Sequence, residues 1–294
     1  MLEDFKEYLE AKKLATNSIS SYVFDIEQYM KYFEDSYGTQ LSKIIYNDIK
    51  GYISYLKNIL KRPPTTINRY LVSLKTYNEF LVKKGIQNEV VISERDSIKI
   101  QVSYDIEDVP TDKDINMLRH ISSENKRDFC FIVIAAYGGP RAEEMVTIMI
   151  DNIDLQKREI GIYGKGNKYR RVIINDLMYF AIEQYLEERR KILPDNPYLF
   201  VGKKSNFYKN KPLARNFANR LLDKYNKLIK QTRNSEIENL HPHALRKFFC
   251  TNAGNVGYRL EQIAEQAGHS SINTTRRYVG KNRESLHSLA NKMC

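Results

Sequence analysis

Apolar side chains recur at helical spacing through most of the first 90 residues, and no other feature constrains the fold as strongly. One stripe consists of Ile19, Val23, Ile26, Met30 and Phe33, and another of Ile67, Leu71, Leu74 and Leu81. Such stripes are typical of helices that bury one face. The second stripe follows two prolines and ends before Gly85, as helix boundaries often do. We predict an all-α, four-helix domain over residues 1–90 and assign both stripes to its core.

A change of pattern separates this region from the rest of the chain. Residues 91–110 lack helical periodicity and end at a proline, so we predict a linker there. Thr111 and Asp114 form a capping-box variant that begins a second domain over residues 111–294. Residues 129–137 are continuously apolar and precede Gly-Gly-Pro, which indicates a buried helix.

The segment REIGIYGKGNKYRRVII, residues 158–174, contains two β-type runs around a Gly-containing turn and predicts a β-hairpin. The remainder has helical character. The second domain is therefore predicted to be mainly α-helical with a small antiparallel sheet, an α+β unit.

The charge is strongly basic and unevenly distributed. The net charge is +11 and the isoelectric point about 9.3, which favours a polyanionic partner. Residues 1–42 hold 4 basic and 8 acidic side chains, whereas residues 43–84 hold 9 basic and 2 acidic ones. The second half of the helical domain is thus the expected polyanion-binding side, unless its charges form a merely solvated face. The candidates are Lys50, Lys57, Lys61, Arg62, Arg69 and Lys75.

Several classes of protein are disfavoured. The three cysteines, Cys130, Cys250 and Cys294, are far apart and form no C-x-x-C pair, which is typical of reduced thiols rather than of disulfides or a zinc site. The N-terminus lacks the apolar core of a signal peptide. No stretch approaches the roughly 18 apolar residues of a membrane span. We expect a cytoplasmic protein that does not associate with a membrane.

Two clusters could bind an anion. In GGPRAEEM, Arg141 begins a predicted helix, where guanidinium and helix dipole together suit a phosphate. The alternative is a surface salt bridge with Glu143 or Glu144. In HPHALRKFF, His243 and Arg246 are three residues apart on one helical face, which suits proton transfer beside a bound anion. The alternatives are a capping histidine or a metal pair with His241, although acidic and cysteine ligands are missing nearby.

Two further segments have more than one interpretation. The hairpin turn GKGN places Lys165 at its tip, either to reach a ligand or as an ordinary solvated turn. The segment AGHSSINTTRRYVG, residues 267–280, has His269 nine residues before Tyr278. It also has the spacing of a helix-turn-helix DNA-binding regulator.

Taken together, these clusters resemble the tyrosine recombinase (phage integrase) family, in particular its Xer-like branch. The resemblance covers essentially the whole chain and rests on the order of an arginine, a hairpin lysine, H-x-x-R, G-H-S and a tyrosine. It implies a helical core-binding domain that clamps DNA, followed by a catalytic domain with a C-terminal tail helix. Pro140 before Arg141 and Lys247 after Arg246 depart from the usual family pattern.

The resemblance also implies the chemistry. Tyr278 would attack a backbone phosphate and form a 3′-phosphotyrosyl bond, while the Arg141 and Arg246 guanidiniums clamp the phosphate. His243 would accept the tyrosine proton, His269 would donate a hydrogen bond, and Lys165 would protonate the departing 5′-oxygen. Glu144 would support the site without carrying a proton. Neither a metal ion nor a cofactor is implied. Further DNA contacts are expected from hairpin residues Lys168, Arg170 and Arg171.

The expected partner is double-stranded DNA with a specific recombination site, bound by a homotetramer in which the C-terminal tail docks in trans. Leu286 and Leu289 would supply the apolar face of that tail. Integration, transposition and resolution of a mobile element or replicon all fit this chemistry. A helix-turn-helix regulator without catalysis and a type IB topoisomerase-like enzyme remain the alternatives.

Overall fold

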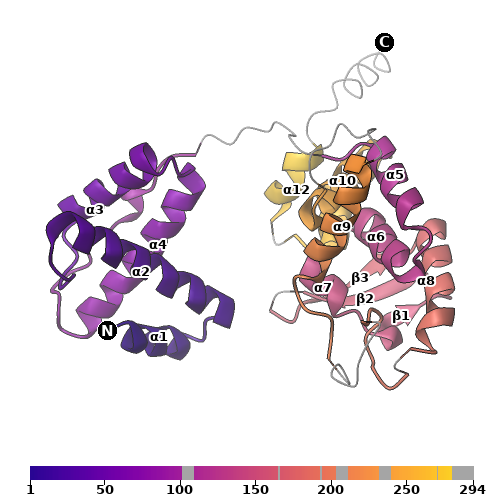
Figure 1. Ribbon diagram of the computed structural model, residues 1–294, viewed down its shortest axis with the longest axis horizontal. Coiled ribbons are helices and arrows are strands. Elements are labelled where there is room, and N and C mark those ends of the chain that lie inside the picture. Colours follow the sequence, from indigo (N-terminus) through magenta and orange to yellow (C-terminus); the bar gives the residue numbers. More distant parts are fainter. Residues whose placement is uncertain are drawn as a thin grey trace, which may run out of the picture. The chain divides into compact units, whose positions relative to one another are not determined.

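The computed structural model describes residues 1–100, 109–164, 166–192, 194–202, 211–231, 240–269 and 271–279 (Figure 1). The chain divides into two compact units, Met1–Ser103 and Tyr104–Cys294. None of the helices in the described ranges is long and apolar enough to cross a membrane.

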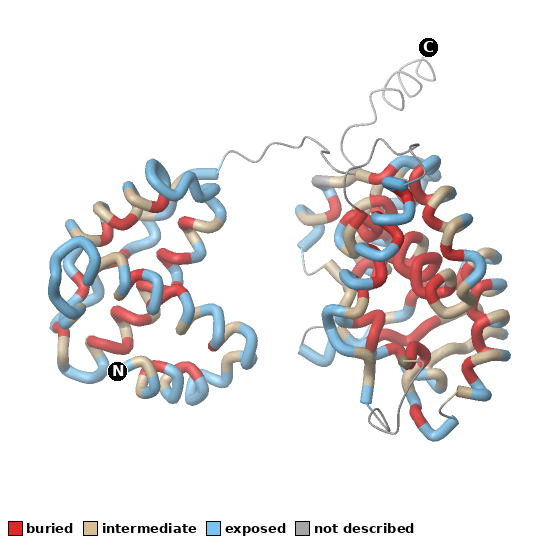
Figure 2. The backbone as a smooth tube through the Cα atoms, viewed as in Figure 1, coloured by how far each residue is buried: buried red, intermediate tan, exposed pale blue. Residues whose placement is uncertain are grey.

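The N-terminal unit consists of four α-helices, as the apolar stripes predict. They are α1 (Leu2–Ala11), α2 (Thr16–Tyr37), α3 (Tyr46–Ser54) with a π-helical extension (Tyr55–Ile59), and α4 (Pro64–Lys83). Their inner faces, red in Figure 2, bury six of the nine stripe residues together with tyrosines, while Val23, Met30 and Phe33 are only partly buried. Tyr52 packs edge-to-face on Tyr29 and on Tyr70. Aromatic burial therefore contributes much of this small core.

The start of the predicted linker packs on the N-terminal unit. Ile92 is buried in its core. The Asn78 side chain accepts a hydrogen bond from the backbone of Val91, and the Asn68 amide both donates to and accepts from the backbone of Ile98. Two asparagines of α4 thus bind the chain that follows the helix. Over residues 91–100 the structure has no α-helix, in agreement with the lack of periodicity, but that pattern does not indicate this attachment.

The C-terminal unit is built around a buried helix. Helix α6 (Lys126–Gly138) has buried side chains on all faces between Cys130 and Ala136. It packs against α5 (Asp112–Ser122), α8 (Asp176–Arg189) and α10 (Pro242–Asn255). Thr111 and Asp114 form the predicted capping box of α5. The other α-helices among the described residues are α7 (Ala142–Val146), α9 (Phe217–Gln231), α11 (Leu260–Ala267) and α12 (Ile272–Val279).

The predicted hairpin is present within a three-stranded antiparallel sheet. Strands β2 (Glu159–Tyr163) and β3 (Tyr169–Ile173) pair from Glu159 opposite Ile173 to Tyr163 opposite Tyr169. The backbone of Gly164 donates to the Lys168 carbonyl at 2.8 Å and closes the base of the turn. Strand β1 (Ile153–Asp154) adds to the other edge of β2 and is too short to give a periodic signal. The mainly α fold with a small antiparallel sheet is confirmed.

Candidate active site

The turn between α6 and α7 places Arg141 at the start of a helix. Gly139 ends α6 with φ of +66°, in the left-handed region that favours glycine. A Cβ at Gly139 would also lie 2.2 Å from the ring of Phe249, so no larger residue fits beside α10. Pro140 then leads to Arg141, the residue before the first turn of α7. The Gly-Pro sequence therefore still delivers the arginine to a helix N-terminus.

Arg141 binds two other parts of the unit. Its Nη1 donates to Glu144 Oε1 at 3.1 Å, and its Nη2 donates to the Gly268 carbonyl at 2.8 Å. Its backbone N–H donates to Glu144 Oε2 at 2.7 Å. The salt bridge that the sequence offered as an alternative thus forms with Glu144, whereas Glu143 pairs with Arg215 instead. The ion pair with Glu144 and a place in the candidate site are compatible, because Arg141 also lines a cavity.

Arg170 binds the same buried carboxylate. Its Nη1 and Nη2 donate to the two Glu144 oxygens at 3.0 and 2.7 Å, and its Nε donates to the Gln266 carbonyl. Burial raises the pKa of Glu144, but the hydrogen bonds from Arg170 and the Arg141 backbone outweigh burial and hold that pKa below its usual range. The Arg170 side chain is 10% exposed. A DNA contact is predicted for Arg170; in the structure its guanidinium binds Glu144 and the Gln266 carbonyl of α11.

Gly268 makes this arrangement possible. Its φ is +71°, and a Cβ there would lie 2.7 Å from Arg170 Cζ. The turn between α11 and α12 therefore passes directly over the guanidinium. The hairpin, α7 and this turn are thus held together by the hydrogen bonds among Glu144, Arg170 and Arg141.

Helix α10 supplies the next two candidates. His241 precedes its first turn, and the His241 Nδ1 accepts a hydrogen bond from the Ala244 backbone at 3.2 Å. The capping role considered for a histidine therefore falls on His241, while His243 is exposed at the cavity. No cluster of three or more potential metal ligands occurs in the part of the chain that the structure describes.

Arg246 is buried at the floor of the site. The residue is 4% exposed, and its Nη1 donates to the Gly139 carbonyl at 2.7 Å. Its buried Nη2 has no hydrogen-bond partner among the described residues. Burial, aided by the positive charge of Arg141, lowers the pKa of Arg246 to about 10, so the group stays charged at neutral pH. A buried cationic donor without a partner is costly and is satisfied by a bound anion.

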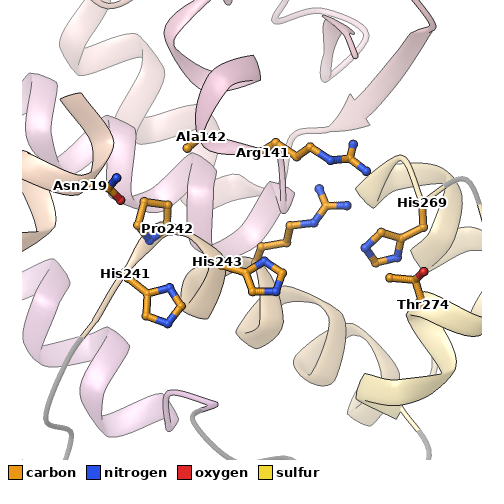
Figure 3. Close-up of a pocket in the computed structure, with 9 residues that line it drawn as sticks. Arg141, Ala142, Asn219, His241, Pro242, His243, His269 and Thr274 are labelled. Atoms are coloured by element: carbon orange, nitrogen blue, oxygen red, sulfur yellow. The ribbon is translucent and has the colours of Figure 1, made fainter. Parts of the chain in front are cut away.

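A cavity of about 400 Å³ lies beside these groups (Figure 3). Arg141 and His269 approach it from one side and His243 from α10, with side chains directed towards a common space. The full lining consists of Arg141, Ala142, Asn219, His241, Pro242, His243, Arg246, His269 and Thr274. Two guanidiniums and several imidazoles around one cavity suit a phosphodiester.

Tyr278 lies on α12 next to this cavity. Its hydroxyl is 3.5 Å from His243 Nε2, and its ring centre is 6.2 Å from that of His269. Its ring packs on a small apolar cluster from α10 and α11. A long hydrogen bond of this kind is common in catalytic sites without substrate. The structure thus brings together Arg141, His243, Arg246, His269 and Tyr278.

Both histidines beside Tyr278 have a lowered pKa, which favours the neutral imidazole at pH 7. Partial desolvation at the cavity and the positive charges of Lys247 and Arg246 lower the pKa of His243. Burial, with the charges of Arg246 and Arg141, lowers the pKa of His269 to about 4. A neutral imidazole can accept a proton on one nitrogen and donate a hydrogen bond from the other.

The remaining predicted residues of the catalytic domain are either outside the described residues or exposed on the hairpin. Lys165 and the tail with Leu286 and Leu289 lie outside the described residues. Gly164 and Gly166, which flank Lys165, line a second cavity of about 750 Å³ that Arg141 and His269 also border. On the hairpin, Lys168 is exposed, and Arg171 is 60% exposed and pairs with Glu159.

In the N-terminal unit, Lys50, Lys57, Lys61 and Arg62 are exposed and Lys75 is half-buried. Arg69 is 46% exposed, but its Nη1 contacts both oxygens of the buried Asp25.

Three residues at the site belong to no motif that the sequence shows. Asn219 of α9 and Thr274 of α12 line the cavity. Thr275 is fully buried and contacts His269. Asn219 comes from a helix without any recognised motif, so the sequence alone gives no reason to place it here.

Family models and known relatives match both units of the chain. Residues 110–285 match the phage integrase family, and residues 2–85 match the phage integrase N-terminal SAM-like domain. A TnP I resolvase from Bacillus thuringiensis is 36% identical over 289 residues, covering 97% of this chain and 96% of the relative. The tyrosine recombinase XerC of Staphylococcus epidermidis is 28% identical over 279 residues, covering 92% of this chain and 89% of XerC.

Solved structures share the fold. The XerH site-specific recombinase bound to a palindromic difH substrate has a TM-score of 0.74 at 20% identity, covering 95% of this chain and 81% of XerH. The Tn1549 transposon integrase in complex with transposon right end DNA has a TM-score of 0.71 at 17% identity, covering 99% of this chain and 98% of the integrase.

Proposed function

The chain belongs to the phage integrase family, and from that premise we propose which of its residues cut and rejoin DNA. It is a tyrosine site-specific recombinase, an enzyme that acts by transesterification. One observation carries the residue assignment. The Tyr278 hydroxyl lies 3.5 Å from His243 beside a cavity that Arg141 and Arg246 line. A regulator without catalysis is not favoured, because it leaves this convergence unexplained.

In the cleavage step, the Tyr278 oxygen attacks the scissile phosphorus. The new bond joins phosphorus to the tyrosine oxygen, and the bond from phosphorus to the 5′-oxygen breaks. Free tyrosine ionises near pH 10, so the attack needs a proton acceptor. His243 takes the proton on Nε2, since its lowered pKa keeps the imidazole neutral before the reaction.

Negative charge on the non-bridging oxygens is stabilised by fixed donors. Arg246 uses its unpaired Nη2, and Arg141 approaches from the α7 side. Neutral His269 adds one hydrogen bond. Glu144 and Arg170 hold Arg141 without touching the phosphate.

Lys165 protonates the departing 5′-oxygen. The phosphotyrosyl bond conserves the energy of the phosphodiester, and a 5′-hydroxyl from the partner duplex then attacks it to rejoin the strands. No step requires a nucleotide, and the guanidiniums supply the positive charge that metal ions provide in other phosphoryl-transfer sites.

The partner is double-stranded DNA that carries a recombination site. DNA contacts come from basic side chains of α3 and its extension, of the segment before α4, of α4 itself and of the hairpin: Lys50, Lys57, Lys61, Arg62, Arg69, Lys75, Lys168 and Arg171. The relative at 36% identity is named a resolvase, which favours resolution of joined DNA molecules of a mobile element as the biological process. The reaction takes place in the cytoplasm.

The active assembly is a homotetramer in which the C-terminal tail of each protomer docks on a neighbour. The apolar spacing of Leu286 and Leu289 supports a docking role. We propose that the tail docks on Ile173, Val256 and Tyr258 of the catalytic unit, which are 49, 66 and 46% exposed and line one cavity of about 120 Å³. Truncation after residue 282 should preserve single-site binding but reduce tetramer formation on paired sites, as measured by analytical ultracentrifugation.

The nucleophile is tested with nicked suicide substrates and denaturing gels. Wild-type protein should form a covalent DNA adduct in excess EDTA, whereas Tyr278→Phe should bind the site with unchanged affinity and form no adduct. An adduct with Tyr278→Phe would mean that another residue attacks. Relaxation of supercoiled DNA without any site preference would instead favour a topoisomerase.

The acid is tested with a 5′-bridging phosphorothiolate, whose leaving group needs no proton. Lys165→Ala should slow cleavage of the normal substrate strongly and cleavage of the phosphorothiolate much less. If both substrates slow equally, another group protonates the leaving oxygen.

A further inference from the structure

Thr275 is a buried hydroxyl that the mechanism above does not use. Its side chain is on α12, it is 0% exposed, and its Oγ1 lies 2.8 Å from His269 Nδ1. Within the described ranges, this is the one hydrogen bond of the Thr275 hydroxyl. Buried hydroxyls are almost always hydrogen-bonded. The hydroxyl proton of Thr275 is therefore expected to point at His269 Nδ1.

The direction of this bond decides which nitrogen of His269 carries the proton. Burial and the Arg246 and Arg141 charges keep this imidazole neutral at pH 7, so it has one N–H and one acceptor nitrogen. If Oγ1–H donates to Nδ1, then the N–H is on Nε2. The opposite arrangement would leave the hydroxyl proton without an acceptor in a dry environment, which costs about 1–3 kcal/mol.

We infer that Thr275 is a positioning residue that holds His269 as the Nε2–H tautomer, with that N–H available to the scissile phosphate. The inference rests on the proposed role of His269 as a donor. In Figure 3 the His269 ring is directed into the space shared with Arg141 and His243. The ring orientation therefore suits a donor on the nitrogen opposite Nδ1.

The place of Thr275 in the fold adds a consequence. Thr275 precedes Tyr278 by three residues on α12, which packs on α10 and α11. A second bond, from Thr251 Oγ1 to the Tyr278 carbonyl at 3.2 Å, also holds this helix on α10. Helix α12, which carries Tyr278, thus also determines which ring nitrogen of His269 carries the proton. His269 is oriented for catalysis only while α12 is docked.

The kinetic test is single-turnover cleavage of a suicide substrate by Thr275→Val, Thr275→Ser, His269→Ala and the double variant. Loss of one oxyanion donor typically slows a reaction by about 100- to 1,000-fold. Thr275→Val should slow cleavage by about 2- to 10-fold, well short of the loss in His269→Ala, because a mixed tautomer still donates part of the time. Thr275→Ser should restore the rate, and Thr275→Val should cause no further loss in the His269→Ala background.

Thr251→Val is the matched control. It removes the other hydroxyl that holds α12 but does not touch His269. Any fold-loss of cleavage rate caused by Thr251→Val should therefore be the same in the wild-type and His269→Ala backgrounds. This control separates docking of the helix from control of the imidazole.

Nitrogen-15 NMR of histidine-labelled protein supplies a readout that packing alone would not change. In the wild type, the His269 signals should show a protonated Nε2 and an unprotonated Nδ1, with assignment by His269→Ala. Thr275→Val should give a mixture of tautomers. Thr275→Ala serves as a second variant if the valine protein does not fold.

The outcomes separate the inference from the mechanism on which it rests. A wild-type His269 with its proton on Nδ1, a Thr275→Val protein that cleaves at the wild-type rate, or multiplicative losses in the double variant would each overturn the role of Thr275. If His269→Ala itself cleaves normally, then the donor role of His269 fails. Adduct formation by Tyr278→Phe would overturn the nucleophile assignment instead.

Discussion

Each unit of the protein has a buried carboxylate that binds an arginine, and the two pairs differ in an instructive way. In the N-terminal unit, Asp25 of α2 is 0% exposed and accepts from Arg69 Nη1 at 2.6 and 2.7 Å and from Ser73 Oγ at 2.7 Å. In the catalytic unit, Glu144 accepts bidentate hydrogen bonds from Arg170 and further bonds from Arg141.

The two carboxyl groups respond oppositely to burial. Burial raises the pKa of Asp25, and Ser73 and Arg69 offset this effect in part. Glu144 is buried too, but Arg170 and Arg141 reverse the effect and lower its pKa. Arg69 is 46% exposed, so water screens its charge, whereas Arg170 is 10% exposed. One pair ties α2 to α4, while the other keeps a charged carboxylate that holds guanidiniums in place for a phosphate.

The largest effect is expected for Glu144→Gln. Removal of the negative charge leaves Arg170 and Arg141 close together without compensation, and breaking a buried pair typically costs about 3–5 kcal/mol. We expect a loss of this size in the unfolding free energy of the catalytic unit, with a severe loss of cleavage. Amide hydrogen exchange of α6 in the full chain measures the unfolding free energy of the catalytic unit separately from that of the N-terminal unit.

Glu143→Gln is the matched control for this prediction. The Glu143 side chain is 46% exposed and pairs with Arg215 on the surface. Its removal should cost at most about 1 kcal/mol. Equal losses for the two variants would remove the distinction between a buried and a surface carboxylate on α7.

Much of this arrangement could be predicted from local sequence. Periodicity gave the four helices, and the Gly-containing turn gave the hairpin, because both signals lie within one element. The order of motifs predicted six catalytic residues, and the structure brings five of them together, while Lys165 lies outside the described residues. Thr275 and Asn219 escaped prediction, because their contacts depend on how α9 and α12 pack rather than on any local pattern.

Arg170 shows a different limit. Successive side chains in a strand face opposite sides, and Arg170 shares its side of β3 with the buried Val172. Alternation could therefore have separated Arg170 from Arg171, which faces solvent. We expected both arginines to contact DNA. Identification of the partner, Glu144, still required the tertiary structure.

Substitution of these neighbouring arginines gives the second prediction. Arg170→Met should lower the unfolding free energy of the catalytic unit by about 2 kcal/mol, since Glu144 keeps Arg141 but loses its bidentate partner. Arg171→Met should leave stability nearly unchanged and reduce the salt dependence of DNA binding by about one unit of slope. Salt-titrated binding and hydrogen exchange measure the two effects. If Arg170→Met changed only the salt slope, then Arg170 would be a DNA contact after all.

The smallest effect concerns pH, and its sign differs between the units. Glu144 has a lowered pKa in the folded protein, so its stabilisation is present above the unfolded pKa of about 4.3 and is lost as the pH falls through the folded value. Asp25 has a raised pKa. Its contribution is present below the unfolded value of about 3.9 and is lost as the pH rises through the folded value.

The third prediction follows from these opposite signs. The stability advantage of wild type over Glu144→Gln should grow between pH 3 and pH 7, whereas its advantage over Asp25→Asn should shrink over the same range. At pH 7, Asp25→Asn should cost no more than about 1 kcal/mol, because asparagine keeps an oxygen acceptor for Arg69 and Ser73. Hydrogen exchange of α2 and α6 at several pH values, with each variant compared at equal pH, measures both trends. If the two advantages grew together with pH, Arg69 would stabilise the ionised Asp25 as fully as Arg170 and Arg141 stabilise Glu144, and the contrast between the units would fail.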